Sequence, residues 1–408
     1  MPAALRIAIF GESYLPYLSG VTIATEALAR GLTEAGHEVL LVVPRPEAAS
    51  SPASPAASSL AASPGPSVAW LPSVQPPPPA PPGYRIPLPV PSPALREARA
   101  FAPDVIHAQS PFVSGLMARR LARELVAPLV FTHHTRFGDY RHYLGPLAAP
   151  GGALMAAYLR RYWLGCAAVI APGSELAAEI AAAIGTHRRR PLVRAIPTGL
   201  DLEWIAAIPE GHPRREAGWT PGVDFVIASL GRLAREKSIE LLLDAFGRAA
   251  SERPQLRFLL IGGGPLEDLA RRRGRREDLR GRLFVTGQRS HAEALGLLKA
   301  CELFAFASRT ETQGLVVAEA LACGVPVVAL EGPGVRDAVR DGTDGVILRR
   351  EPESEAAERL ARALVSLATD ADYRDALARG ASDGAGRFAL QRRVEGVVEL
   401  YRETLASR

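Results

Sequence analysis

The sequence predicts an α/β protein made of two similar halves, each built on its own parallel sheet. Short apolar runs alternate with longer amphipathic stretches along most of the chain, which is the pattern of parallel strands joined by helices. The pattern starts again near residue 224, after a segment rich in proline and glycine. A chain of 408 residues also exceeds what one hydrophobic core usually organises. We therefore expect two domains in tandem.

The first domain spans residues 1–199. Short apolar runs bounded by turn residues predict its strands, and an amphipathic run predicts a helix over residues 23–35. Residues 44–93 differ, because proline, alanine and serine dominate them and cannot close a core; we expect a long, extended surface loop there, with a proline-binding partner as the alternative. The predicted strands cover residues 6–10, 38–43, 104–107, 129–132, 168–171 and 193–197.

The second domain spans residues 200–385, and a final segment, 386–408, follows it. The same alternation of short strands and helices predicts a second parallel sheet. Helical patterns cover residues 355–381 and 387–405. The predicted strands cover residues 224–230, 256–261, 282–285, 303–306 and 325–330.

The net charge of +5 belongs to the first half of the chain. Residues 1–199 hold 17 arginines against 11 acidic residues, or +6, and the remainder holds 31 basic against 32 acidic residues, or −1. Nucleic-acid binders usually add aromatic stacking, but only 6% of this chain is aromatic, so we expect no nucleic-acid partner. An anionic membrane surface fits the charge better, and a solvated basic face without a partner is the alternative.

Cysteine usage and hydropathy favour a reduced compartment. The three cysteines stand far apart without a C-x-x-C pair, so neither a structural disulfide nor a zinc site is expected. No run of about twenty apolar residues occurs, and residues 1–10 have the pattern of a first strand rather than a signal peptide. We expect a cytoplasmic protein that can bind peripherally to the inner face of the membrane.

Residues 308–329 carry most of the functional information. Glu311 and Glu319 stand eight positions apart, and Gly314 opens an apolar helix between them. The unpaired N–H groups and positive dipole end of such a helix suit a diphosphate, and the two carboxylates can accept hydrogen bonds from sugar and ribose hydroxyls. The alternative is a pair of solvated charges. Glu319, however, interrupts an otherwise apolar run and requires a partner.

This spacing, with the segment 322–328 that follows, resembles the E-x7-E motif of retaining glycosyltransferases of family four. The resemblance implies a GT-B fold: two Rossmann-like domains with parallel sheets facing across a cleft, and a C-terminal helix that crosses back to the first domain. It also implies donor contacts. Glu311 with the amides of Gln313, Gly314 and Leu315 would hold the sugar hydroxyls and diphosphate, and Glu319 would hold the ribose.

Further loops match the donor side of the family. Arg232 and Lys237, after Gly231, resemble its G-R-x5-K pattern and would stabilise the departing diphosphate without a metal or other cofactor; the alternative is two exposed loop charges. Gly20 resembles the glycine loop that approaches the donor phosphate. The loop at Gly287 is expected near the base. Because it has no acidic residue from 287 to 290 to accept from guanine, it favours a uridine donor.

The acceptor side is marked by the segment 131–143. His134 resembles the histidine that packs beside the transferred sugar, although a structural histidine is the alternative. Many family members have an H-x-H pair where this chain has His107-Ala-Gln109, so the role of the second histidine is open. The D-Y-x-H-Y stretch of bacterial diacylglycerol glucosyltransferases is matched by Asp139, Tyr140, His142 and Tyr143.

These features together predict a hexosyltransferase. We expect transfer from a nucleoside diphosphate sugar, UDP-glucose, to a membrane lipid such as diacylglycerol. An apolar stretch, residues 147–159, ends in Arg160-Arg161 and could lie on an anionic bilayer; an ordinary core helix is the alternative. Other open alternatives are mannosyl or other hexosyl transfer to a phosphoinositide or soluble sugar, a sugar-nucleotide epimerase, and a non-catalytic nucleotide-sugar binder. The oligomeric state is not predicted.

Overall fold

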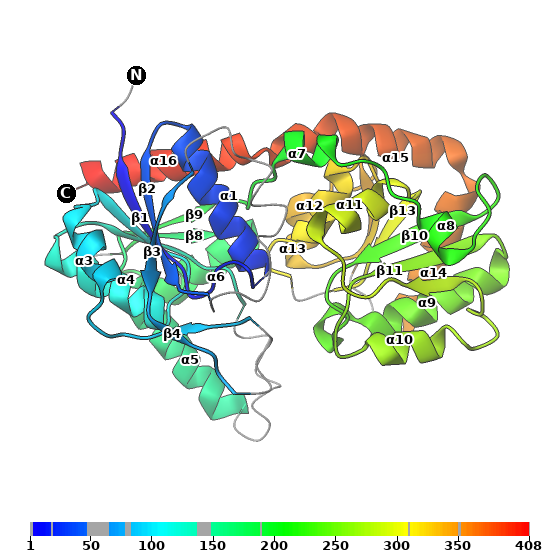
Figure 1. Ribbon diagram of the computed structural model, residues 1–408. Coiled ribbons are helices and arrows are strands. Elements are labelled where there is room, and N and C mark those ends of the chain that lie inside the picture. Colours follow the sequence, from blue (N-terminus) through cyan, green and yellow to red (C-terminus); the bar gives the residue numbers. More distant parts are fainter. Residues whose placement is uncertain are drawn as a thin grey trace. The chain divides into compact units, whose positions relative to one another are not determined.

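The computed structural model of the protein describes residues 3–17, 19–46, 65–77, 83–136, 148–187, 190–308, 311–349 and 352–407. The chain forms two compact units. Unit 1 comprises Met1–Gly199 with Leu390–Arg408, and unit 2 comprises Leu200–Ala389. Each unit contains a parallel sheet with helices on both of its faces (Figure 1).

The sheet of unit 1 has seven strands in the order β3-β2-β1-β6-β7-β8-β9. Alternate side chains of β1 serve the two faces: Ala8 and Phe10 pack with α3 to α6, whereas Ile7 and Ile9 pack with α1 and α16. The elements are β1 (Arg6–Phe10), α1 (Gly20–Glu34), β2 (Glu38–Pro44), β3 (Ser67–Leu71), β4 (Ser73–Val74), β5 (Ile86–Pro87), α3 (Pro93–Ala100), β6 (Val105–Ala108), α4 (Val113–Glu124), β7 (Leu129–Thr132), α5 (Ala148–Trp163), β8 (Ala168–Ala171), α6 (Ser174–Ile184), β9 (Leu192–Ala195) and α16 (Leu390–Ala406).

The prediction of a loop over residues 44–93 is wrong for part of that range. β3 pairs in parallel with β2, with Leu40 opposite Ser67 and Pro44 opposite Leu71, and Ala69 and Leu71 are buried. Its sequence, Ser-Val-Ala-Trp-Leu, has the β-branched and aromatic residues that favour a strand. The prolines and serines on either side conceal this short run in the composition.

The last helix, α16, belongs to the core of unit 1 although it follows unit 2 in the sequence (Figure 1). It packs against α1 at Gly31, where an added Cβ would lie 2.7 Å from Val394 Cγ2. Its chain also passes close to Gly199, where a Cβ would lie 2.5 Å from Leu390 Cα. Glycine at both positions lets the helix pack closely, and Tyr401 of α16 itself is fully buried.

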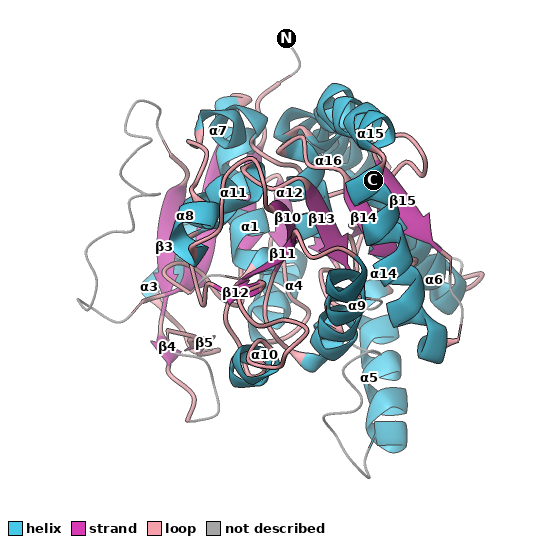
Figure 2. Cartoon of the chain, turned by 90° about the vertical axis from the view of Figure 1, so that its right-hand side faces the viewer, coloured by secondary structure: helices cyan, strands magenta, loops and turns pink. Residues whose placement is uncertain are grey.

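The sheet of unit 2 has six strands in the order β12-β11-β10-β13-β14-β15. On one face α9 and α14 lie side by side (Figure 2). The elements are α7 (Leu202–Ala207), α8 (Pro213–Ala217), β10 (Phe225–Leu230), η2 (Arg235–Lys237), α9 (Ile239–Glu252), β11 (Leu256–Ile261), α10 (Glu267–Arg273), β12 (Leu283–Val285), α11 (His291–Lys299), β13 (Leu303–Phe306), α12 (Leu315–Ala322), β14 (Val327–Leu330), α13 (Pro333–Ala338), β15 (Gly345–Leu348), α14 (Glu353–Thr369), α15 (Ala371–Gly384) and η3 (Ala385–Phe388).

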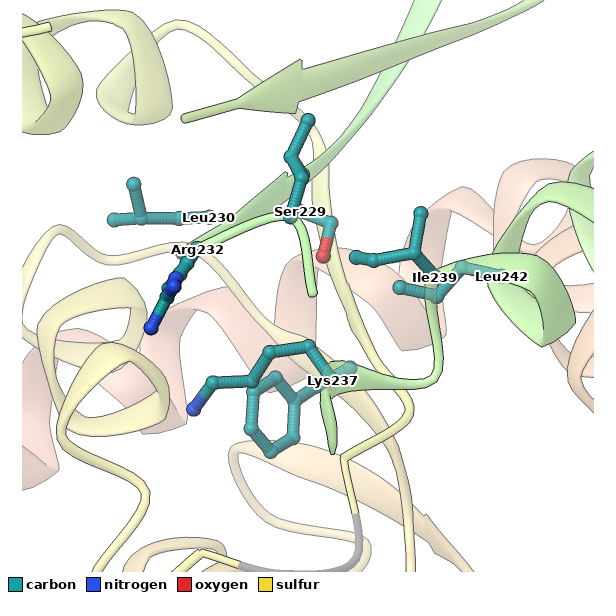
Figure 3. Close-up of a pocket in the computed structure, with 9 residues that line it drawn as sticks. Ser229, Leu230, Arg232, Lys237, Ile239 and Leu242 are labelled. Atoms are coloured by element: carbon teal, nitrogen blue, oxygen red, sulfur yellow. The ribbon is translucent and has the colours of Figure 1, made fainter. Parts of the chain in front are cut away.

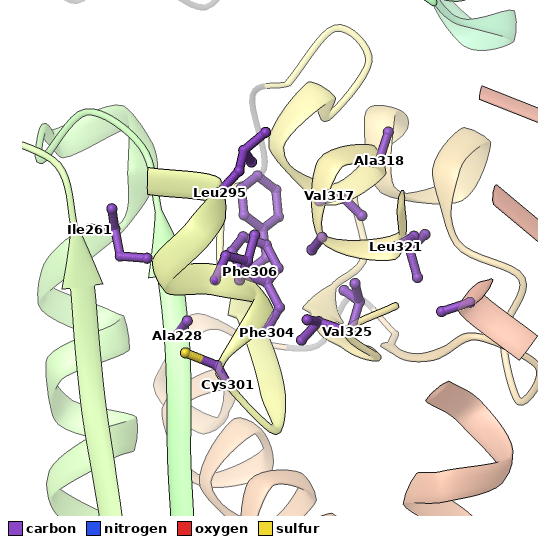
Figure 4. Packing of buried hydrophobic residues seen from close by; sticks show 14 of the residues in the cluster. Ala228, Ile261, Leu295, Cys301, Phe304, Phe306, Val317, Ala318, Leu321 and Val325 are labelled. Carbon is purple, nitrogen blue, oxygen red and sulfur yellow. The ribbon is translucent and has the colours of Figure 1, made fainter. Parts of the chain in front are cut away.

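On the opposite face of this sheet α11 and α12 pack over β10, β11 and β13. Figure 4 shows Phe304 and Phe306 of β13 between the neighbouring strands and the helices, close to Val317. This apolar layer positions the amino-terminal ends of α11 and α12. The helix predicted over residues 355–381 is in fact two helices, because Asp370 accepts a hydrogen bond from Tyr373 N and starts α15.

Candidate functional site

The helix between the two glutamates begins where the sequence predicts it. Gly314 precedes α12 with a φ of 67°, a left-handed conformation that glycine adopts without strain. The loop is closely packed, because a Cβ on Gly334 would lie 2.4 Å from the carbonyl carbon of Gln313. The N–H groups of the first turn, which includes Leu315, point out of the helix at this end and are suited to an anion.

Glu311, in the loop before α12, forms an ion pair with Lys237. Lys237 ends the short helix η2, and Ser238 follows it in a left-handed conformation with a φ of 52°. The two side chains are partly exposed, at 28% for Lys237 and 17% for Glu311. The structure therefore brings together two predicted site residues that lie 74 positions apart in the sequence.

A pocket in unit 2 lies at the carboxyl end of β10. Arg232 and Lys237 line it together with Gly231, and Figure 3 shows the nitrogen ends of Arg232 and Lys237 directed to the same side. The glycines here are required by close backbone contacts, since a Cβ on Gly262 would lie 2.1 Å from Gly231 O. The remaining lining residues are Ser229, Leu230, Leu233, Ile239, Leu242 and Phe306. One guanidinium and one ammonium group at the same pocket favour an anionic ligand.

Glu319, in the middle of α12, is buried and pairs with His291. The side chain of Glu319 is 5% exposed, and its Oε1 lies 2.8 Å from His291 Nε2. The ring of His291 also packs against Trp204, with ring centroids 5.1 Å apart. The sequence predicted that Glu319 needs a partner but did not identify one. Ser290 and Glu293 form a capping box that marks where α11 starts. This sequence pattern could have placed His291 at the first position of a helix, but it could not have shown the contact with Glu319.

The other two glycines predicted to approach the nucleotide sugar, Gly20 and Gly287, lie at a helix start and in a turn. Gly20 begins α1 after Ser19, whose Oγ accepts from Thr22 N at 3.1 Å. A Cβ on Gly20 would meet nothing within 4 Å in the described part of the chain, so space rather than packing surrounds it. Gly287 has a φ of 70° and forms a bridge with Gly262 at the edge of the unit 2 sheet. Gly287 thus lies beside the same glycine turn that contacts Gly231.

In unit 1, His134 follows β7 and contacts Gln109, which follows β6. His134 Nε2 lies 2.8 Å from Gln109 Oε1. Burial, with Arg393 nearby, lowers the pKa of His134 to about 3. The adjacent strands β6 and β7 end at the same edge of the sheet, which is why residues 25 positions apart meet here. A neutral imidazole at this edge can exchange hydrogen bonds with a hydroxyl but does not carry charge.

Below His134, a buried polar network links β6 and β7 to α16. His107 Nδ1 lies 2.6 Å from Tyr401 Oη, and His107 Nε2 lies 2.7 Å from Thr132 Oγ1. Arg393, 5% exposed, donates to Ala24 O at 3.2 Å and forms no ion pair with a carboxylate in the described residues. Burial lowers the pKa of Arg393 to about 10. The sequence did not indicate the contribution of Arg393 or Tyr401.

Comparison with known proteins identifies the class of this chain. The family model for glycosyltransferase family 4 matches residues 18–204, and the model for glycosyl transferases group 1 matches residues 215–382. The chain belongs to glycosyltransferase family four. It is a glycosyltransferase that uses a nucleotide sugar, and it acts as a hexosyltransferase.

Curated relatives of this glycosyltransferase differ in their named substrates. The α-monoglucosyldiacylglycerol synthase of Streptococcus pneumoniae is 31% identical over 63% of this chain and 58% of the relative, so the match spans little more than half of that protein. The enzyme of the same name from Acholeplasma laidlawii is 28% identical over 86% of each chain. A GDP-mannose-dependent α-mannosyltransferase of Mycolicibacterium smegmatis is 28% identical over 84% of each chain.

Solved structures show that the glycosyltransferase has the GT-B fold. Anabaena HepE, in a complex with UDP and glucose, superposes with a TM-score of 0.70 over 99% of this chain and 100% of that one, at 20% sequence identity. The two parallel sheets described above are the two Rossmann-like halves of this fold.

Some predicted features of the glycosyltransferase lie outside the described residues or differ from expectation. Asp139, Tyr140, His142 and Tyr143 fall within residues 137–147, which the structure does not describe. The predicted apolar helix is α5, but Arg160 is engaged within unit 1. It donates through Nε to Ala183 O at 2.7 Å, at the end of α6, and its NH2 group lies 2.6 Å from His187 Nε2.

Two features are absent from the described residues. Across these ranges no three His, Cys, Asp or Glu side chains are grouped to hold a metal ion. Nor does any helix within them combine the length and hydropathy needed to cross a bilayer.

Proposed function

We propose that this glycosyltransferase transfers glucose from UDP-glucose to a hydroxyl of a membrane lipid such as diacylglycerol, with retention at the anomeric carbon. One observation carries the donor half of the proposal. Arg232 and Lys237 line one pocket of unit 2, and Lys237 pairs with Glu311 in the loop that opens α12. Cations for a diphosphate and a carboxylate for sugar hydroxyls therefore adjoin each other, next to a helix amino terminus.

The ion pair between Lys237 and Glu311 suggests the order in which the contacts with the sugar nucleotide form. A diphosphate that enters the pocket competes with Glu311 for the ammonium group of Lys237, because phosphate oxygens carry more charge. The carboxylate of Glu311 is then available to accept hydrogen bonds from the sugar. As the bond between the anomeric carbon and the phosphate oxygen breaks, charge builds on the leaving diphosphate, and Arg232 and Lys237 stabilise it. No resident metal is needed for this step.

Retention is what the resemblance to family four implies, and because its motifs in this sequence supply no carboxylate nucleophile for a double displacement, we propose a front-face displacement. The acceptor oxygen bonds to the anomeric carbon on the face that the diphosphate leaves, and the acceptor proton passes to an oxygen of the leaving phosphate. Atoms and charge balance without a covalent enzyme intermediate. In this mechanism His134, neutral and held by Gln109, contributes a hydrogen-bonding ring rather than a charge.

The choice of uridine and of a lipid rests on three supports. The loop from Gly287 to Ser290 offers no carboxylate to the base. Two relatives are named as α-monoglucosyldiacylglycerol synthases. In α5, Leu154 is 74% exposed beside exposed alanines at 153, 156 and 157, an apolar face that can enter a bilayer surface.

Mannosyl transfer is the second candidate, because three of the relatives are named for their use of GDP-mannose. The acceptor in that case would be a phosphoinositide or a soluble sugar. An epimerase would consume its donor without any acceptor, and a non-catalytic binder would not consume it at all.

A donor and acceptor panel tests the proposal. The purified protein is incubated with UDP-glucose, UDP-galactose or GDP-mannose, with diacylglycerol in anionic vesicles, phosphatidylinositol vesicles, a soluble sugar, or no acceptor. We expect UDP release only with UDP-glucose and diacylglycerol, and an α-linked product by NMR. If GDP-mannose is the one donor that is turned over, then GDP-mannose rather than UDP-glucose is the substrate. Turnover without an acceptor would indicate epimerisation or hydrolysis.

A further inference from the structure

His291 links the buried glutamate of α12 to two other helices of unit 2. It is the first residue of α11, its Nε2 lies 2.8 Å from Glu319 Oε1, and its ring packs against Trp204 of α7. The start of α11 is itself held in place, because Ser290 and Glu293 exchange hydrogen bonds in a capping box. His291 therefore has little freedom to leave Glu319.

The contact leaves one carboxylate oxygen of Glu319 available. Within the described residues, His291 provides the one side-chain hydrogen bond of Glu319, and that bond is to Oε1. A buried carboxylate without such a donor is strongly destabilised, because it loses its solvation without compensation. With Oε1 held by His291, the second oxygen of Glu319, Oε2, points in a defined direction.

We propose that His291 is a positioning residue for nucleotide recognition: it orients Glu319 so that Oε2 accepts a hydrogen bond from a ribose hydroxyl of the bound nucleoside diphosphate. The inference rests on the proposed function, in which Glu319 holds the ribose. The proposal gives a role in nucleotide binding to His291 of α11, whereas the two glutamates of the motif lie in and before α12. It also makes affinity for ribose over deoxyribose depend on a histidine that does not itself touch the nucleotide.

Two substitutions separate the hydrogen bond from the packing. His291→Phe keeps a ring against Trp204 but removes the donor, whereas His291→Gln keeps an N–H donor without an imidazole. Isothermal titration calorimetry on the full-length protein gives the affinities for UDP and 2′-deoxy-UDP, and far-UV circular dichroism checks the fold. A role in packing alone would affect the two nucleotides equally.

We expect the wild-type protein to prefer UDP over 2′-deoxy-UDP by about tenfold or more, the usual value of a hydrogen bond to a charged group. His291→Phe should reduce this ratio to near one, and His291→Gln should retain most of it. An unchanged ratio in folded His291→Phe would overturn the inference. If wild type binds neither UDP nor GDP, the proposed function fails instead. If only GDP binds, the same test with 2′-deoxy-GDP decides the inference.

Discussion

His134 Nε2 and Gln109 Oε1 lie 2.8 Å apart, and Gln109 occupies the position where many members of the family have a second histidine. An amide oxygen can only accept, so with the amide in this orientation a neutral His134 donates from Nε2. The amide nitrogen of Gln109 is buried without a hydrogen-bond partner among the described residues. The orientation of the Gln109 amide and the tautomer of His134 are thus linked.

Changing Gln109 to glutamate should alter the protonation of His134. A carboxylate beside the imidazole favours the charged form, so the pKa of His134 should rise from about 3 by one or more units. NMR titration of the histidine Cε1 signals measures this directly, with Gln109→Asn as the uncharged control. If the His134 signal in Gln109→Glu titrates as in the wild type, the contact does not control its protonation.

Loss of either cation at the pocket should reduce turnover strongly. Arg232→Ala and Lys237→Ala should each lower kcat by about 100- to 1000-fold, the usual effect of removing a preorganised charge stabiliser. The free energy of unfolding, measured with urea, should change by less than about 1 kcal/mol, because the Lys237–Glu311 pair is partly exposed. Arg235→Ala, in the same helix η2 as Lys237 but outside the pocket lining, is the matched control and should keep its activity. Near-normal turnover in either test variant would remove that residue from the leaving-group role.

Catalysis should not require a divalent metal. Arg232 and Lys237 already face the diphosphate in the proposed mechanism, and a chelator cannot remove them. Activity measured in excess EDTA, after dialysis against the chelator, should stay within about twofold of the untreated value, since the cations supply the stabilisation that a metal would. Loss of activity that magnesium or manganese restores would contradict this.

Acid should destabilise unit 1 through its buried histidines. Burial lowers the pKa of His133 to about 4 and of His134 to about 3, and lowers that of His107 well below its ordinary value of 6.5. Below pH 6.5 the unfolded chain binds protons that the folded chain excludes, so the free energy of unfolding falls as pH decreases. Each histidine contributes about 1.4 kcal/mol per pH unit until its folded form titrates.

Urea unfolding followed between pH 7.5 and 4.5 measures this dependence. His107→Gln should make the slope of unfolding free energy against pH shallower by the contribution of one histidine. His212→Gln, which changes an exposed residue of unit 2, is the control and should leave the slope unchanged. Equal slopes in wild type and His107→Gln would show that His107 does not take part.

The exposed face of α5 should bind anionic membranes. Because Arg160 is held by the end of α6, Leu154 is a cleaner probe than the arginines. Leu154→Glu should reduce sedimentation with anionic vesicles by several-fold, since it places a charge in the apolar boundary. Val223→Glu changes a similarly exposed residue of unit 2, 65% exposed, and should leave vesicle binding unchanged. Equal loss in both variants, or no binding by the wild type, would argue against a membrane role for α5.

The sequence by itself determined the class of this protein and most of its strands. The alternation of apolar runs predicts two parallel sheets because burial on both faces imposes that pattern locally. The glycine at 314 and the apolar run after it predict the start of α12, since helix initiation depends on neighbouring residues. The same local reasoning missed β3, whose short apolar run is surrounded by residues 44–66 and 72–93 of opposite composition.

Only the tertiary structure decided which side chains meet. His291 and Glu319 are 28 positions apart, Gln109 and His134 are 25 apart, and His107 and Tyr401 are 294 apart. Such contacts depend on strand order and on which face each helix covers, and no local pattern encodes either. The return of α16 to unit 1 illustrates the reason: its apolar face matches α1, but only the folded chain shows that Arg393 and Tyr401 then lie beneath the histidines.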